Sequence, residues 1–482
     1  MSETKVGCPG FFVSALRGGS GKTLLTIGLT AAFKALGKKT APFKKGPDYI
    51  DAGWLSLAAG RPCYNLDTYL ISESQVLQSY LKNTFYTHSD IAVIEGNRGL
   101  FDGIDLDGRT STAETAKLLG LPVILCLDCT KSTRTMAAAV LGCLHFDPAV
   151  TIGGVILNRV AGPRHRDNVA DNIRYHTGVP VLGAIPKLRS HDFPERHMGL
   201  VPTTEHEWAT QSILAAETLV RDNVDLDQIL HIAEELSRVH SHSDLFTDSN
   251  TNTSAPSFAD NIDKPVIGVI RDSAFQFYYP ENIEALELSG ARIVFLSPLK
   301  NSAFPTDIDG LYIGGGFPET HARELAANAE FRQKIKSLAE QGFPVYAECG
   351  GLMYLGHELV IDSVNYPMVD IFPISFGLSK KPQGHGYVVA EVTRKNPYFE
   401  LGAEVRGHEF RYSQILEWDE KQDETAFTMQ RGTGMKDRKD GICYKNVFAC
   451  YTHIHALGIP SWAPNFVHRA SEYRSNKIQL PK

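Results

Sequence analysis

Short apolar runs alternate with longer segments of helical pattern over the first 190 or so residues. The apolar runs predict strands at residues 10–15, 39–43, 91–95, 123–128, 152–158 and 181–185. Between them, helical patterns span residues 22–35, 112–119 and 164–176. Such alternation is typical of βαβ units, so it predicts a parallel sheet covered by helices on both faces. Ligands bind such sheets at the carboxyl ends of the strands.

The pattern changes after residue 203. Residues 204–240 are mainly helical in pattern, and residues 241–264 are rich in Ser, Thr, Asn and Asp, which predicts a flexible linker. A second α/β pattern follows, with apolar runs at 266–270, 291–296, 310–313, 344–348, 386–392 and 447–451. We therefore expect a first domain at 1–203, a helical extension at 204–240, a linker at 241–264 and a second domain at 265–482.

Composition excludes several classes of protein. A chain of 482 residues is too long for one hydrophobic core, and its net charge of −7 argues against a nucleic-acid-binding surface. No apolar run reaches the roughly 18 residues that a transmembrane helix needs. The N-terminus lacks the layout of a secretory signal, and the eight cysteines are scattered, as suits a reducing compartment. We expect a cytoplasmic protein without a membrane or nucleic-acid partner.

A glycine-rich loop lies between the first predicted strand and the first predicted helix. Its backbone N–H groups can wrap phosphate oxygens, its lysine can reach the β/γ-phosphates, and its threonine can ligate Mg²⁺. The residues expected to bind the nucleotide are Gly18, Gly19, Ser20, Gly21, Lys22 and Thr23. Leu16 occupies the usual first glycine position, so a turn without a ligand is the alternative. The loop resembles the variant K-G-G-x-G-K-T loop of the MinD/ParA/dethiobiotin synthetase branch, with Arg17 replacing the lysine.

Acidic residues follow two of the predicted strands. Asp48 and Asp51 come after the second strand, and Glu95 and Asp102 lie at or after the third. Mg²⁺ prefers one or two carboxylates together with phosphate oxygens and water, so these residues are candidate ligands. Each of them could instead be a solvated loop acid.

Four stretches of the first domain resemble cobyrinic acid a,c-diamide synthases: PFKKGPDYID, AAGRPCYNLD, EG-x-x-GLFDG and STAE-x-AKLL. Those enzymes are glutamine-dependent amidotransferases of tetrapyrrole side chains. The resemblance implies Mg-ATP at Thr23, Asp48 and Glu95. It also implies a site, surrounded by Asp48, Asp51, Glu95 and Asp102, where a substrate carboxylate meets the γ-phosphate. Asn158 matches the adenine-recognising position of this branch, although it could simply cap the next turn.

The sequence departs from that family at two places. Arg17 replaces a small residue, and Asn97-Arg98 replaces the usual Val-Met. Arg98 could pair with a propionate or acetate of the substrate, or it could be exposed or ion-paired. Cobyrinic acid is therefore the leading substrate, and sirohydrochlorin, sirohaem and Ni-sirohydrochlorin are alternatives.

The second domain carries a cysteine at a predicted strand–turn–helix junction. Small neighbours and a helix N-terminus suit Cys349 to be a nucleophile, although a buried structural cysteine is the alternative. Gly315 and Gly316 can present backbone N–H groups as an oxyanion hole, and His453 follows a strand far along the chain.

These segments resemble class I glutamine amidotransferases, in which a cysteine attacks the glutamine amide and a histidine shuttles the proton. His453 aligns with that base, and His455 stands where those enzymes usually carry an orienting glutamate. The prediction is therefore a Cys349–His453 dyad without an assigned third member. A metal site at the two histidines is an alternative.

Together, the motifs predict a ligase that uses ATP, Mg²⁺ and glutamine to amidate the a and c acetates of a tetrapyrrole through an acyl phosphate. The expected partners are small molecules, and a homodimer is left open. A different class of function is a ParA/MinD-like ATPase switch with an inert amidotransferase domain. A tetrapyrrole-binding or chaperone protein that has lost catalysis is a third.

Overall fold

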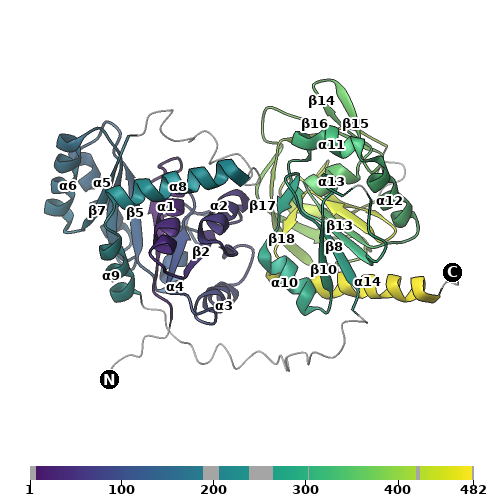
Figure 1. The fold of residues 1–482 in the computed structure, drawn as a ribbon, viewed down its shortest axis with the longest axis horizontal. Helices are drawn as coiled ribbons and strands as arrows, with labels where there is room; N and C mark the ends of the chain where they lie inside the picture. Colours follow the sequence, from purple (N-terminus) through teal and green to yellow (C-terminus); the bar gives the residue numbers. More distant parts are fainter. Residues whose placement is uncertain (1–6, 188–205, 238–263, 302, 420–423, 480–482) are drawn as a thin grey trace. The chain divides into compact units, whose positions relative to one another are not determined.

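The computed structural model describes residues 7–187, 206–237, 264–301, 303–419 and 424–479. The chain divides into two compact units, residues 1–251 and 252–482, and each is described by itself (Figure 1). The predicted linker at 241–264 lies outside the described residues, apart from Lys264. Among the described residues, no helix is both long enough and apolar enough to cross a membrane.

The first unit is built on one parallel sheet, as the alternating pattern predicts. Its strand order is β3-β2-β4-β1-β5-β6-β7, and every pairing in it is parallel. The strands are β1 Gly10–Ala15, β2 Thr40–Lys45, β3 Tyr64–Leu66, β4 Ile91–Glu95, β5 Val123–Asp128, β6 Ile152–Val160 and β7 Val181–Pro186. Helices cover both faces of a parallel sheet, so its central strands are buried. Every residue is buried in β1, β2 and β4, and all but the last are buried in β5.

Helices follow the strands in the order that βαβ units require. They are α1 Lys22–Ala35, α2 Tyr49–Ala59, α3 Glu73–Thr84, α4 Thr112–Leu119, α5 Arg134–Phe146 and α6 Pro163–Thr177. Two further helices, α8 His206–Asn223 and α9 Leu226–Leu236, lie within the segment whose sequence pattern is mainly helical. Apolar residues of α1, α8 and α9 join residues of β1, β4 and β5 in one core cluster, so the later helices complete one face of this sheet.

The second unit contains a larger mixed sheet of order β10-β8-β11-β13-β22-β21-β20-β17-β18-β23. Its parallel half consists of β10 Arg292–Leu296, β8 Val266–Ile270, β11 Gly310–Ile313, β13 Val345–Glu348 and β22 Val447–Cys450. Its antiparallel half consists of β21 Lys439–Tyr444, β20 Glu424–Arg431, β17 Gly384–Val392, β18 Glu404–Arg411 and β23 His453–Ile454.

Two small sheets complete the strands of this unit. One pairs β9 Phe275–Phe277 with β12 Gly315–Gly316. The other has the order β15-β14-β16-β19, with β14 Glu358–Ile361, β15 Val364–Pro367, β16 Ile374–Leu378 and β19 Ser413–Trp418.

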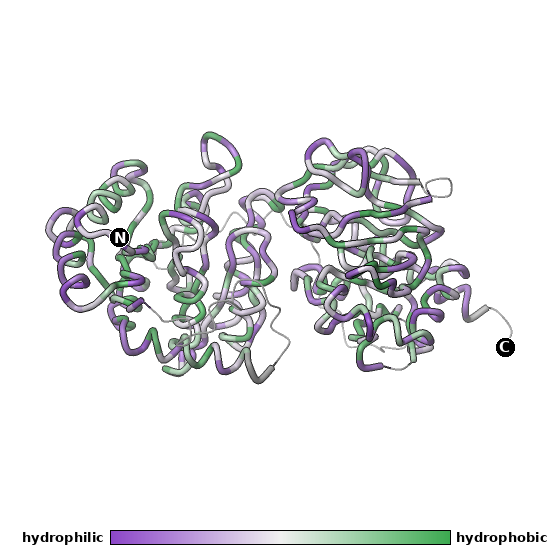
Figure 2. The backbone as a smooth tube through the Cα atoms, turned by 90° about the horizontal axis from the view of Figure 1, so that it is seen from above, coloured by the Kyte–Doolittle hydropathy of each residue, from purple (hydrophilic) through white to green (hydrophobic). Residues whose placement is uncertain are grey.

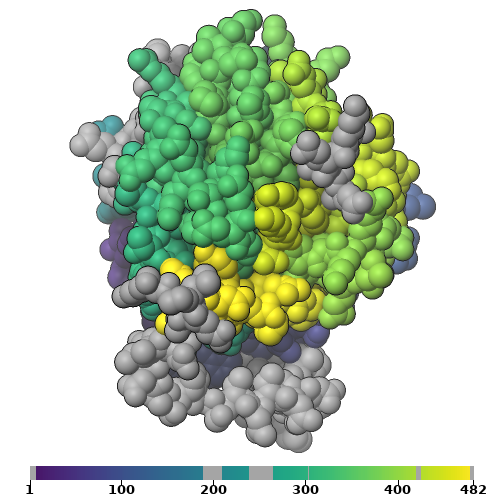
Figure 3. All heavy atoms as spheres, turned by 90° about the vertical axis from the view of Figure 1, so that its right-hand side faces the viewer, coloured from purple at the N-terminus to yellow at the C-terminus, as the bar shows by residue number. Residues whose placement is uncertain are grey.

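Helices pack on both sides of the larger sheet. They are α10 Pro280–Leu288, α11 Ala322–Ala327, α12 Ala329–Glu340, α13 Gly350–Leu355 and α14 Trp462–Gln479. Helix α14 packs against β8 and β11, and its outer surface is visible in yellow in Figure 3. Figure 2 shows green, apolar stretches inside each unit and purple, polar stretches along much of the outside. In the first unit the predicted reactive segments lie at the carboxyl edge of the parallel sheet, and in the second unit Cys349 follows β13 in the parallel half of the mixed sheet.

Candidate active site

The phosphate-binding loop of the first unit connects β1 to α1, as predicted. Gly19 and Gly21 have φ values of 72° and 88°, which favour glycine because it lacks a Cβ atom. A Cβ atom added to Gly21 would lie 2.3 Å from Asn158 Nδ2, so this position also has no room for a side chain. Lys22 Nζ donates to the carbonyl of Arg98 at 2.6 Å and to that of Arg17 at 3.4 Å.

Two side chains from neighbouring strands hold this loop. Asn158, on β6, donates from Nδ2 to the Ser20 carbonyl at 2.8 Å, and the buried Cys126 thiol donates to the same carbonyl at 3.4 Å. Asn158 therefore has a structural contact with the loop that the sequence did not predict. Its expected role in adenine recognition stays a prediction.

Carboxylates and a lysine converge beside the loop. Thr23 Oγ1 donates to Glu95 Oε1 at 2.7 Å, and Lys44 Nζ lies 3.1 Å from that oxygen and 2.7 Å from Asp51 Oδ2. Asp48 Oδ1 caps α2 by accepting from the Asp51 backbone N–H at 2.9 Å. The structure thus brings Thr23, Glu95 and Asp51 together around a buried lysine to which the sequence analysis gives no role.

Burial and crowding shift the ionisation of this cluster. Burial and the neighbouring Asp51 raise the pKa of Glu95 to about 7 and that of Asp48 to about 6. Burial would lower the pKa of Lys44, but Asp51 and Glu95 raise it above its ordinary value. An additional cation beside Glu95 and Asp48 would favour their ionised forms.

The donors present fit a nucleotide-bound Mg²⁺ ion. Glu95 Oε2 is buried without a hydrogen-bond partner, and it lies on the same carboxylate that accepts from Thr23. Nowhere in the described part of the chain do three His, Cys, Asp or Glu side chains form a ready metal site. Mg²⁺ takes few protein ligands when phosphate oxygens and water complete its coordination shell. Thr23 and Glu95 would therefore be enough protein ligands for a nucleotide-bound Mg²⁺ ion.

Two further predicted residues of this unit, Asp102 and Arg98, lie on the loop after β4, and Arg17 lies on the phosphate-binding loop. Asp102 Oδ2 accepts from the Gly99 backbone N–H at 2.8 Å, and Asp102 is exposed. Arg98 is exposed too and has a φ of 49°. Arg17 is 74% exposed and reaches Asp128 Oδ2 at 3.3 Å, an oxygen that Arg159 also contacts at 2.9 Å.

The second unit has its cysteine at the predicted sharp turn. Cys349 joins β13 to α13 with a φ of 48° and a ψ of −100°, and its backbone N–H donates to the Cys450 carbonyl at 2.7 Å. A positive φ in a non-glycine residue costs energy and is a feature of nucleophile elbows. Cys349 is only 5% exposed and lies at the N-terminus of a helix.

The predicted oxyanion-hole glycines lie beside this turn. A Cβ atom added to Gly315 would lie 2.4 Å from His453 Cε1, and one added to Gly350 would lie 3.0 Å from the Gly316 backbone nitrogen. The backbone of β12 therefore approaches both the histidine and the elbow. Their use as oxyanion donors stays a prediction.

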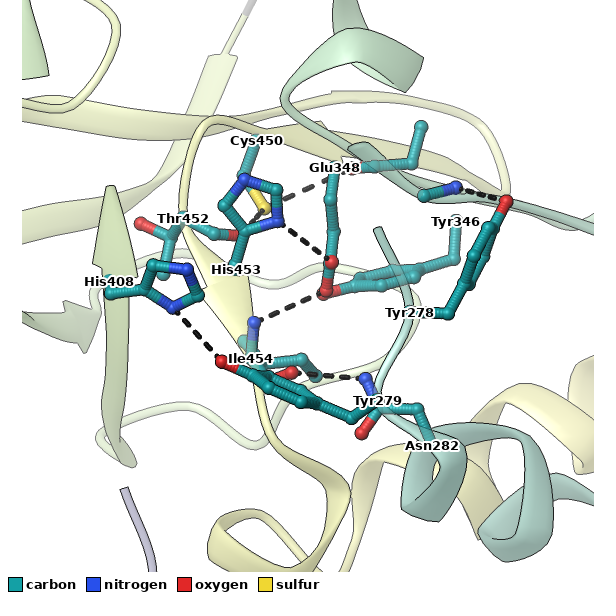
Figure 4. A network of polar contacts seen from close by, with 12 residues as sticks. Tyr278, Tyr279, Asn282, Tyr346, Glu348, His408, Cys450, Thr452, His453 and Ile454 are labelled. Atoms are coloured by element: carbon teal, nitrogen blue, oxygen red, sulfur yellow. Dashed lines mark hydrogen bonds and ion pairs between the residues drawn. The ribbon is translucent and has the colours of Figure 1, made fainter. Parts of the chain in front are cut away.

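His453 contacts both Cys349 and the carboxylate of Glu348, which no sequence motif singles out. Its Nδ1 lies 3.3 Å from Glu348 Oε2, and the two side chains face each other in Figure 4. Burial would lower the pKa of His453, but side-chain hydrogen bonds with Cys349 and Glu348 raise it to about 10. A thiol hydrogen-bonded to a protonated imidazole is an arrangement suited to nucleophilic catalysis.

The other histidines nearby have different partners. His455 Nε2 lies 3.7 Å from Glu281 Oε2, and its ring packs on that of Tyr279 at 4.7 Å between centroids. His408, on β18, stacks on His453 at 4.9 Å. His408 could not be predicted from a motif, because only the pairing of β18 with β23 brings it to His453.

Comparison with known proteins agrees with both halves of this description. A family model described as the CobQ/CobB/MinD/ParA nucleotide binding domain matches residues 11–201. A second model, the CobB/CobQ-like glutamine amidotransferase domain, matches residues 266–460. A solved glutamine amidotransferase covers 42% of this chain and 98% of its own, at 17% identity and a TM-score of 0.33, a likeness too distant to add to this.

Curated relatives match along nearly the whole chain. A cobyrinate a,c-diamide synthase of Magnetococcus marinus is 41% identical, covering 95% of this chain and 96% of its own. Enzymes of the same name from Methanosarcina barkeri and Archaeoglobus fulgidus are 36% and 38% identical, covering 98% and 93% of this chain and 97% and 95% of their own. With a phosphate-binding loop in one unit and a cysteine elbow in the other, the chain belongs to the cobyrinate a,c-diamide synthase family of glutamine amidotransferase ligases.

Proposed function

We propose that this protein uses ATP and glutamine to amidate the a and c acetate carboxylates of cobyrinic acid. The observation that carries the proposal is the presence of two complementary sites in one chain. One is a buried thiol hydrogen-bonded to a histidine, and the other is a phosphate-binding loop beside acidic side chains. A carboxylate is a poor electrophile, so amide formation needs both a source of ammonia and a way to activate the acid.

The second unit releases ammonia from glutamine in this proposal. The Cys349 sulfur attacks the side-chain amide carbon, and the backbone N–H groups near Gly315 and Gly316 stabilise the oxyanion. His453 donates its proton to the departing nitrogen, which leaves a thioester on Cys349. Water then hydrolyses the thioester to glutamate, with His453 as the base.

The first unit activates the substrate. The substrate carboxylate attacks the γ-phosphorus of ATP, and ADP leaves, so that the acid becomes an acyl phosphate. Lys22 and Thr23 would hold the phosphates, and Thr23, Glu95 and Asp48 would hold the metal. Bound Mg²⁺ supplies charge neutralisation of the transferring phosphoryl group. Ammonia then displaces phosphate and gives the amide.

Cobyrinic acid is the substrate that we favour, because the near-full-length relatives carry its name. Exposed Arg98, on the same loop as Asp102, is available to pair with one of its many carboxylates. Sirohydrochlorin, sirohaem and Ni-sirohydrochlorin offer similar carboxylates and remain alternative substrates. Adenine recognition by Asn158 and substrate contacts by Asp51 and Asp102 belong to the same proposal.

Two variants separate the two half-reactions. Cys349→Ala should lose amidation with glutamine but keep amidation with ammonium, because the first unit still activates the acid. Glu95→Gln should lose amidation with either nitrogen donor, yet keep glutamine hydrolysis. Product is measured by mass spectrometry and glutamate by an enzymatic assay, with Cys443→Ala as a control for the loss of a cysteine elsewhere in the second unit.

Retention of glutamine-dependent amidation in Cys349→Ala would contradict this assignment. A wild-type protein that hydrolyses ATP and dimerises with it, but never releases glutamate, would instead favour an ATPase switch.

A further inference from the structure

His453 lacks the orienting acid at the place where related amidotransferases carry it, two residues further along the chain. That place is taken by His455, which accepts from the Leu457 backbone N–H and faces Glu281 and Tyr279. We infer that Glu348, the residue directly before the nucleophile, is the positioning residue that orients His453 and holds it as an imidazolium. This inference rests on the proposed use of Cys349 and His453 for glutamine hydrolysis.

The Glu348 carboxylate is fixed at both oxygens. Its Oε2 faces His453 Nδ1 at 3.3 Å, while Oε1 accepts from the Tyr346 hydroxyl at 3.0 Å and from the Ile454 backbone N–H at 3.2 Å. Figure 4 shows these contacts converging on one side chain. With Nδ1 engaged by Glu348, Nε2 is left to meet the Cys349 sulfur, which is the ring orientation that proton transfer needs.

The backbone explains why residues 105 positions apart meet here. Strand β13 pairs in parallel with β22, so Glu348 lies opposite Cys450. The chain then turns to place His453 on β23, the third residue after Cys450, where it pairs with β18. One strand end therefore supplies both the acid and the nucleophile, and the adjacent strand end supplies the histidine.

Charge favours the same assignment. Glu348 is 0% exposed and His453 is 2% exposed, and a buried carboxylate is costly unless a cation or several donors face it. The ionisable groups that face His453 are Glu348, Cys349 and the stacked His408. Burial and the neighbouring His453 and His455 lower the pKa of His408 well below its ordinary value, so His408 is neutral and does not compete for the carboxylate.

The inference predicts which part of the pH profile depends on Glu348. Ammonia leaves from glutamine only if His453 carries a proton to donate, so kcat/KM for glutamine hydrolysis falls on the alkaline side as His453 deprotonates. Glu348 raises the pKa of His453 and thereby extends activity toward high pH. Removal of the carboxylate charge should move this alkaline limb to lower pH.

The test is the pH dependence of glutamine hydrolysis in the full-length Glu348→Gln protein. We expect the alkaline limb to move down by roughly one pH unit or more. We also expect kcat to fall about a hundredfold, with a smaller change in KM, because the ring loses its orienting partner. Glu348→Asp should restore the position of the limb in part. Glu281→Gln, which removes a buried carboxylate next to the other histidine, should leave the limb in place.

A Glu348→Gln profile that is lowered in height but unmoved in pH would overturn the inference, since a purely structural defect has that effect. If this variant does not fold, NMR titration of His453 in the Cys349→Ala chain decides, because the thiol no longer raises the pKa of the ring there; His453→Gln is used for assignment. We expect a protonated ring at about pH 8, where an ordinary histidine is neutral, and a neutral ring would overturn the inference. Ammonium-driven amidation should be unchanged in Glu348→Gln. Its absence from the wild-type protein would contradict the proposed function and not the role of Glu348.

Discussion

Unusual backbone angles mark the reactive positions at the scale of single residues. Cys349 has a φ of 48°, which projects its thiol from the turn, and Gly21 has a φ of 88° at the start of α1. At Gly21 the backbone angle and the space both exclude a side chain, because Asn158 lies directly against it. The Asn158 amide in turn donates to the Ser20 carbonyl, so this contact contributes to the shape of the phosphate-binding loop.

We predict that Gly21→Ala destabilises the first unit and abolishes ATP binding. An alanine there has the positive-φ cost of about 1–2 kcal/mol and would also push Asn158 away from Ser20. Gly37→Ala is the matched control, because Gly37 has a φ of 79° and no atom within 4 Å of an added Cβ. Calorimetric ATP titration should show that Gly21→Ala no longer binds ATP and that Gly37→Ala still does. Hydrogen exchange should show that Gly37→Ala loses only the stability that a positive φ costs an alanine. Normal ATP binding by Gly21→Ala would contradict this account of the loop.

Helix α8 contributes to the fold at the scale of elements, since it packs closely against α1. Gly28 of α1 makes the approach possible, because an added Cβ would lie 2.5 Å from both the Ala216 carbonyl oxygen and Val220 Cγ2. Helix α1, which begins at the phosphate-binding loop, is thus packed against α8. Helix α8 begins 20 residues after Pro186, the last residue of the last strand of the sheet.

Two glycines inside helices should respond to alanine in opposite ways. Gly28→Ala should lower the stability of the first unit by about 1–3 kcal/mol, since the backbone of α8 must move. Gly142→Ala on α5 should raise it by up to about 1 kcal/mol, because no atom lies within 4 Å and alanine favours helices. Hydrogen exchange of peptides from α1 and α8 measures both effects. Equal protection in the two variants would show that the close contact does not contribute.

The sequence predicts those helices and strands whose hydrophobic periodicity and end signals lie within the segment itself. Helix α4, for example, begins after Ser111, which caps it, and ends at Gly120 in a left-handed conformation. The three-residue strand β3 is too short for a periodic signal. Among the site residues, the loop, the elbow and His453 were predictable from motifs. Glu348 was not, because its partner lies 105 residues away and only the pairing of β13 with β22 brings them together.

At the scale of the whole molecule, each compact unit carries the residues for one half of the proposed reaction. The first contains a phosphate-binding loop with Lys22 and Thr23, and Glu95 lies beside it. The second contains Cys349, His453 and Glu348. With glutamine as the nitrogen donor, neither set would form the amide by itself, because one supplies ammonia and the other an activated acid. The central claim is that the chain joins these steps on one tetrapyrrole.

That claim is tested most directly by mass spectrometry of the product formed from cobyrinic acid, glutamine and Mg-ATP. We predict the exchange of two carboxylic acids for amides, with one ATP converted to ADP and one glutamine to glutamate for each amide. Sirohydrochlorin and its nickel form serve as competing substrates in the same assay. Cobyrinic acid left unchanged while glutamine and ATP are both available, or amidation of a competing ring in preference to it, would contradict the account.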